Sequence, residues 1–126
     1  MIFYNSLYKI ITSEKTDTGH AMTLEMEHTH PLFKGHFPGS PVLPGVVLLQ
    51  IIRECVENSF SKAIFLEYKD IQQCKFPMPI VMENNRNIRL DFSIQGDDAS
   101  LFRLNATVKD EQTVFAVLKA GLAVSF

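Results

Sequence analysis

The chain has 126 residues, of which 46% are apolar and 21% charged, and a formal charge of −2. This length predicts a single domain over residues 1–126, and the composition argues against disorder. The near balance of 12 basic and 14 acidic residues provides no positive field for nucleic acid or an anionic membrane surface. The longest apolar run, Val46 to Leu49, is far too short to span a bilayer, and no secretory leader precedes it, so we expect a cytoplasmic protein.

Apolar periodicity predicts one substantial helix and six strands. The helix begins at Gly45 and ends near Phe60. Its first two turns are apolar on every side except Gln50, which predicts burial, whereas Glu54 and Glu57 predict a later face near solvent. Consecutive strands joined by short turns indicate an antiparallel sheet, so we expect an α+β architecture. The strands are expected at 3–13, 21–27, 63–76, 88–95, 102–109 and 114–124.

A cluster of proline and glycine separates the second strand from the helix. Four of the six prolines and three of the six glycines fall within residues 31–45. Such a segment cannot form a regular helix or strand, and ordered loops of this length are usually functional. His36 lies inside the cluster, where a stiff backbone and a pKa near neutrality suit a general base. The alternative is a histidine that only hydrogen-bonds the loop together.

Two residues of the predicted helix are also candidates for a site. Gly45 is at the helix start, where free backbone N–H groups stabilise a developing oxyanion and a glycine permits close approach. The alternative is that Gly45 only relieves packing after Pro44. Gln50 is the sole polar residue between Val46 and Ile52, and a buried amide must be hydrogen-bonded or line a polar site.

Residues 36–46, HFPGSPVLPGV, resemble the pattern H-F-P-G-x-P-V-x-P-G-V of the 3-hydroxyacyl-acyl carrier protein dehydratases of the FabZ/FabA type. The resemblance implies a hotdog fold, in which a curved antiparallel sheet wraps a long helix. It also implies dehydration, or the reverse hydration, of a 3-hydroxyacyl thioester, which is lyase chemistry. His36 would remove the α-proton, and the N–H of Gly45 would bind the thioester carbonyl. The carbonyl of Val42 would orient His36, and Phe37 would lie in the substrate site.

The same resemblance places Val46 at the substrate and Gln50 where the family has an acidic residue. An amide accepts and donates hydrogen bonds but supplies no proton, and loss of a general acid typically costs about 10²–10⁴-fold in rate. Three alternatives follow. His36 returns its own proton to the leaving hydroxyl while Gln50 positions that hydroxyl; or Glu54, one turn on, replaces the acid; or the chain is one subunit of a mixed dimer whose partner brings the acid.

The resemblance further implies an acyl carrier protein or coenzyme A thioester as partner, in fatty-acid or polyketide-like synthesis. In the family two subunits share each active site, so we expect a homodimer or larger assembly, or a heterodimer with a related subunit. No metal or redox cofactor is expected, because the thioester itself acidifies the α-carbon. Alternative functions are a hotdog thioesterase and a non-catalytic acyl-binding or partner subunit.

Two further signals have simple interpretations. Cys55 and Cys74 lie outside any CxxC pattern and are expected to be reduced core or half-buried thiols. His28 and His30 form an HxH pair near His20 and Glu27, but no third ligand has suitable spacing, so we expect no metal site.

Overall fold

The computed structural model describes residues 2–34, 41–61, 63–96 and 101–125. This part of the chain holds no helix with the length and hydropathy that a bilayer crossing requires. His36 and Phe37 lie outside the described residues. The elements are β1 (Tyr8–Lys15), β2 (His20–Met26), the short 3-10 helix η1 (Pro31–Phe33), α1 (Gly45–Asn58), β3 (Phe65–Lys75), β4 (Asn87–Gly96), β5 (Leu101–Lys109) and β6 (Val114–Ser125).

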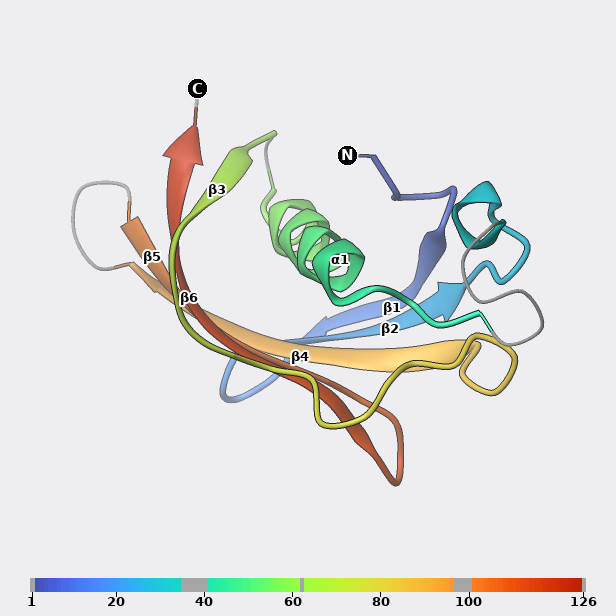
Figure 1. Ribbon diagram of the computed structural model, residues 1–126. Coiled ribbons are helices and arrows are strands. Elements are labelled where there is room, and N and C mark those ends of the chain that lie inside the picture. The colour runs from blue at the N-terminus through green and yellow to red at the C-terminus, as the bar shows by residue number, and fades with distance from the viewer. Residues whose placement is uncertain (1, 35–40, 62, 97–100, 126) are drawn as a thin grey trace.

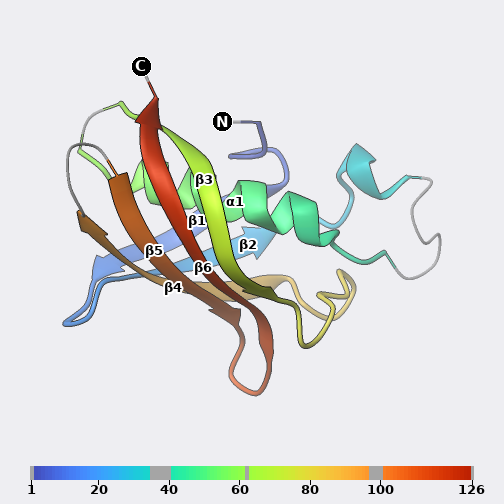
Figure 2. The ribbon, with the colours of Figure 1, turned by 60° about the vertical axis from the view of Figure 1, so that its left-hand side comes forward.

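The strands form one antiparallel sheet in the order β1-β2-β4-β5-β6-β3. The sheet curves strongly, and α1 lies in its concave side (Figures 1 and 2). Through α1 the chain passes from β2 to the opposite edge of the sheet, where β3 lies beside β6. The predicted α+β architecture, with one helix packed on an antiparallel sheet, is confirmed.

Burial of the sheet-facing side of α1 forms the core. Leu48, Ile51, Ile52 and Cys55 are at most 3% exposed, and they belong to one apolar cluster with buried side chains of the sheet. Removing an aliphatic side chain of this size from water is worth about 1.5–3 kcal/mol. Apolar packing of this face is therefore the main interaction that holds α1 against the sheet.

The first strand begins later than the predicted 3–13. The backbone N–H groups of Ser6 and Leu7 both donate to the carbonyl of Phe3, at 3.0 and 2.8 Å. Asn5 has φ of 65°, a left-handed conformation that asparagine tolerates better than most residues. A turn thus precedes β1, and the apolar residues before Tyr8 belong to it.

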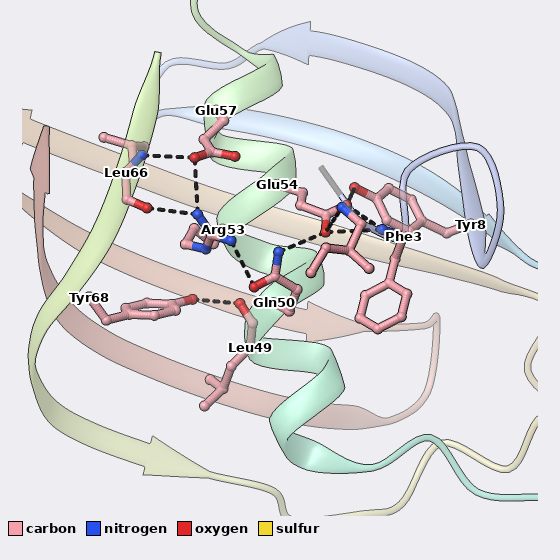
Figure 3. Close-up of polar contacts among 10 residues, drawn as sticks. Phe3, Tyr8, Leu49, Gln50, Arg53, Glu54, Glu57, Leu66 and Tyr68 are labelled. Atoms are coloured by element: carbon pink, nitrogen blue, oxygen red, sulfur yellow. Dashed lines mark hydrogen bonds and ion pairs between the residues drawn. The ribbon is translucent and has the colours of Figure 1, made fainter. Parts of the chain in front are cut away.

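Two expectations about the helix faces are wrong. Val46, within the all-round apolar segment, is 74% exposed because it lies on the outer side of the first turn. Glu54 and Glu57, expected near solvent, are 0% and 6% exposed. Their carboxylates are covered by the segment before β1 and by β3, which the helical pattern alone could not reveal (Figure 3).

The edge strand β3 is exposed along most of its length. Of its large apolar side chains, Phe65 is 64% and Ile71 is 46% exposed. Cys74, expected to be at least half-buried, is exposed because this end of β3 extends past the helix, whereas Cys55 is buried as predicted. Both cysteines are free thiols.

Candidate active site

The start of α1 is an open helix N-terminus. The carbonyl of Pro44, the N-cap residue, accepts from the N–H groups of Val47 and Leu48, each at 3.1 Å. Among the residues that the structure describes, no side chain forms a capping hydrogen bond at this end of the helix. The first two N–H groups, those of Gly45 and Val46, have no carbonyl within the helix to bind. Together with the positive end of the helix dipole, they favour a partner with negative charge.

An apolar pocket lies beside this helix start. Its volume is about 330 Å³, and it contains Gly45 and Val42 but not Val46 or Gln50. Phe76 packs on Gly45 so closely that a Cβ there would lie 2.8 Å from two carbons of the ring. Gly45 therefore has a packing role within the chain, which is compatible with its role at the helix N-terminus. The lining residues are Val42, Leu43, Pro44, Gly45, Leu48, Phe76, Met78, Pro79, Ile80 and Phe115.

The segments on either side of residues 35–40 are anchored. On the later side, Leu43 N–H donates to the carbonyl of Ile80 at 3.0 Å, and Met82 N–H donates to the carbonyl of Pro41 at 2.9 Å. These bonds flank the bridge between Val42 and Val81 and fix Val42 at the pocket. On the earlier side, η1 ends at Phe33, which is 8% exposed. The predicted base His36 itself lies outside the described residues.

Gln50 is held between two charged neighbours on α1 (Figure 3). Its Nε2 donates to Oε2 of Glu54 at 2.8 Å, and its Oε1 accepts from Nη2 of Arg53 at 2.8 Å. The expectation that a buried amide is hydrogen-bonded is therefore met. Gln50 is half-buried and lies one helical turn after the exposed Val46, on the outer side of the helix rather than in the apolar pocket.

Glu54 is a buried carboxylate surrounded by donors. It accepts from the backbone N–H groups of Ile2, Phe3 and Tyr4 at 2.9–3.2 Å, from the hydroxyl of Tyr8 at 3.0 Å, and from Gln50. These donors engage both carboxylate oxygens, and the side chain is fully buried, so no part of it is open to a substrate. The geometry therefore does not favour Glu54 as a replacement acid.

Burial and this charge also affect neighbouring groups. The pKa of Tyr8 is raised far above its ordinary value, first by burial and then by the charges of Cys55 and Glu54. Tyr8 is consequently a neutral donor to Glu54 at any physiological pH. Burial likewise raises the pKa of the Cys55 thiol to about 12, which makes it a poor nucleophile.

Arg53 ties the helix to the edge strand. Its Nη1 donates to the carbonyl of Leu66 at 2.8 Å and lies 3.2 Å from Oε2 of Glu57. The same carboxylate accepts the N–H of Leu66 at 2.8 Å. Tyr68, two residues further along β3, donates its hydroxyl to the carbonyl of Leu49 at 2.8 Å. The outer side of α1 is thus joined to both rims of the sheet by polar contacts.

The histidines near η1 and β2 have other partners. Nδ1 of His30 accepts the N–H of Leu32 at 3.0 Å, as the N-cap of η1. Nε2 of His20 is 2.9 Å from Oγ of Ser13. Within the described residues no group of three or more His, Cys, Asp or Glu side chains gathers as a metal site would require.

The sequence did not single out Arg53 or Phe76. Arg53 and Glu54 stand three and four residues after Gln50, which is the spacing of neighbours on a helix surface. This spacing could have predicted their contacts with the Gln50 side chain. Phe76 carries no comparable signal, because its contact with Gly45 depends on how β3 crosses the helix.

A comparison with protein families identifies one family for this chain. A family model described as ApeI-like, ApeI dehydratase, matches residues 12–117. The 3-hydroxyacyl-[acyl-carrier-protein] dehydratase FabZ of Chlamydia trachomatis is 33% identical over 72 residues, 51% of this chain and 46% of that protein. The chain thus spans about half the length of that relative.

Solved structures share the fold. "The Dehydratase Heterocomplex ApeI:P from Xenorhabdus doucetiae" superposes with a TM-score of 0.62 at 20% identity, covering 91% of this chain and 96% of that chain. The BH2602 protein of Bacillus halodurans, solved with CoA, gives a TM-score of 0.57 at 13% identity, covering 92% and 74%. These likenesses confirm the predicted hotdog fold. Because the family model matches most of the sequence, the chain belongs to the ApeI-like dehydratase family.

Proposed function

We propose that the protein dehydrates a 3-hydroxyacyl thioester, or catalyses the reverse hydration. The observation that carries the proposal is the open N-terminus of α1 beside an apolar pocket of about 330 Å³; the residues of the motif that begins at His36 lead into this helix in the sequence. A thioester needs donors for its carbonyl and an apolar volume for its acyl chain, and these two features supply them. Membership of a dehydratase family supports the same reaction.

In the proposed mechanism His36 removes the α-proton while the carbonyl oxygen gains negative charge. The N–H of Gly45 and the helix dipole stabilise that charge. The bond from the β-carbon to the hydroxyl then breaks, and a double bond forms between the α- and β-carbons. His36 returns its proton to the departing hydroxyl, which leaves as water. Gln50 hydrogen-bonds the hydroxyl and supplies no proton.

The carrier is proposed to be acyl carrier protein or coenzyme A, within fatty-acid or polyketide-like synthesis. FabZ of Chlamydia trachomatis is named for acyl carrier protein substrates, and the Bacillus halodurans structure contains CoA. Both carriers present the acyl group as a thioester, on which the proposed chemistry depends. The predicted cytoplasmic location is part of the same proposal.

A second subunit is proposed to pair with the exposed edge strand β3. An unprotected edge with exposed apolar side chains at Phe65 and Ile71 favours pairing with another chain. A homodimer is the first candidate. The second is a mixed dimer whose partner brings the missing acid, because a solved structure of similar fold is a dehydratase heterocomplex. Sedimentation of the purified chain separates the two: a monomer at micromolar concentration would contradict the homodimer.

The deciding assay incubates the purified protein with a 3-hydroxyacyl thioester of each carrier and identifies products by mass spectrometry. We expect the enoyl thioester, and its loss in His36→Ala. Free acid as the main product would instead indicate a thioesterase. If the protein is silent alone but active with a co-expressed homologue, the mixed dimer replaces the homodimer.

A further inference from the structure

We propose that Arg53 is a positioning residue that fixes which end of the Gln50 carboxamide faces the reacting hydroxyl. The inference rests on the proposed function, because it assigns Gln50 a contact with the 3-hydroxyl group. Arg53 would then do more than join α1 to β3, because it would hold the Gln50 amide in the orientation that contacts this hydroxyl.

The orientation of the carboxamide follows from the charges on either side. Oε1 of Gln50 faces the guanidinium of Arg53, and Nε2 faces the carboxylate of Glu54, both at 2.8 Å. Rotating the amide by half a turn would place N–H against guanidinium N–H and oxygen against carboxylate oxygen. Both contacts would then be repulsive, so the observed orientation is the only one that satisfies both neighbours.

Both neighbours are themselves fixed. Arg53 holds the carbonyl of Leu66 and the carboxylate of Glu57 through Nη1, which leaves Nη2 for Gln50. Glu54 is fully buried and bound to the segment before β1. The guanidinium side chain is 23% exposed, so solvent screens its contact less than it would screen a surface pair. The amide is therefore anchored at both ends by groups that cannot easily turn away.

One Nε2–H of Gln50 remains after the bond to Glu54 is formed. Hydrogen bonds in series polarise one another, so the Arg53 contact at Oε1 draws electron density from the amide nitrogen and strengthens this donor. A hydroxyl that leaves as water gains negative charge on its oxygen, and a preoriented donor stabilises that charge. Gln50 thus acts as a donor in the transition state without transferring a proton.

The test measures kcat and KM for dehydration in Arg53→Met, Gln50→Ala and the double variant. A misoriented hydrogen-bond donor costs about tenfold or more in rate. We expect that loss in kcat for Arg53→Met, with little change in KM. In the Gln50→Ala background, Arg53→Met should change kcat by less than about twofold, because residues acting through one another are not additive. An equal loss in both backgrounds would overturn the proposal.

Tyr68→Phe is the matched control, because it removes another hydrogen bond between β3 and α1 without touching Arg53 or the Gln50 side chain. It should lower the denaturation midpoint as Arg53→Met does, while kcat stays within about twofold of wild type. An equal loss of kcat in both variants would show that Arg53 acts only through stability.

A second readout is independent of activity, so failure of the dehydratase proposal is distinguishable from failure of this inference. In the ¹⁵N spectrum, the side-chain amide signals of Gln50 should shift and exchange faster with water in Arg53→Met. Those of the exposed Gln95 should not change. If the wild type dehydrates no substrate, the proposed function fails; if the Gln50 signals are unchanged in the variant, the positioning role fails.

Discussion

Replacing Gln50 by glutamate places a second carboxyl group against Glu54, at the contact where Nε2 now lies 2.8 Å from Oε2. Backbone N–H groups and the Tyr8 hydroxyl already donate to Glu54, so an added carboxylate meets acceptor oxygens there and no donor. Two like charges about 4 Å apart repel by about 4 kcal/mol at an effective dielectric constant near 20. Attraction to the guanidinium of Arg53 offsets part of this repulsion, but Arg53 is already paired with Glu57. We therefore expect a net penalty of about 1–3 kcal/mol on the ionised form of the new carboxyl.

This penalty makes the stability of Gln50→Glu depend on pH. The repulsion raises the folded-state pKa of the new carboxyl above its value in the unfolded chain. Between these two values the folded chain holds more protons than the unfolded chain, so stability falls as pH rises. The variant should match wild type near pH 4 and be about 1–3 kcal/mol less stable at pH 8.

Urea denaturation of Gln50→Glu and wild type at a series of pH values measures this difference. Gln95→Glu, on the exposed end of β4, serves as the control and should show no such slope. A difference from wild type that stays constant between pH 4 and 8 would refute the proposed contact with Glu54. The dehydration rate should fall relative to wild type as pH rises towards 8, because the ionised carboxyl is no longer a donor; an unchanged ratio of the two rates would show that no donor is required at residue 50.

Three other variants and one labelling experiment address the remaining contacts. Gly45→Ala should cost no more than about 1 kcal/mol in urea denaturation, because its Cβ meets the outer ring carbons of Phe76 at 2.8 Å and that side chain, 44% exposed, has room to move aside; Phe76→Ala should remove this cost in the double variant. Glu54→Gln should destabilise by about 1–3 kcal/mol, because one acceptor oxygen is replaced by an amide N–H that faces donors; an unchanged free energy of unfolding would contradict the described network. In a Cys74→Ser background, a thiol reagent at pH 8 should leave Cys55 unmodified until the chain unfolds, because burial raises the pKa of that thiol to about 12; rapid labelling in native buffer would contradict its burial.

Much of the fold was predictable because it depends on local patterns. The alternation of Met22 and Leu24 with polar residues places β2 correctly, and the change after Pro44 from a broken pattern to helical periodicity marks the start of α1. The boundary of β1 was not predictable, because the turn at Asn5 depends on backbone N–H groups of residues 2–4 binding a carboxylate about fifty residues away.

The candidate site was predictable where a motif carries it. Val42 and Gly45 do meet at one pocket, and Gln50 does have partners for its amide. The exposure of Val46 and the burial of Glu54 were not predictable from the helix alone. Both depend on which side of α1 faces the sheet and which side the segment before β1 covers. A helical pattern records how apolar a face is, and it does not record whether polar chain segments will cover its charged residues.

The donors to Glu54 have a consequence for the order in which the protein is made. Residues 2–4, Tyr8 and Gln50 all precede Glu54 in the chain, so each has already left the ribosome when Glu54 emerges. Glu57, in contrast, waits for Leu66, nine residues later. Domains form as their segments appear during synthesis. The buried carboxylate of Glu54 can thus form its hydrogen bonds before β3 to β6 have been synthesised. The rest of the sheet then assembles around a helix that is already attached to β1 and to the segment before it.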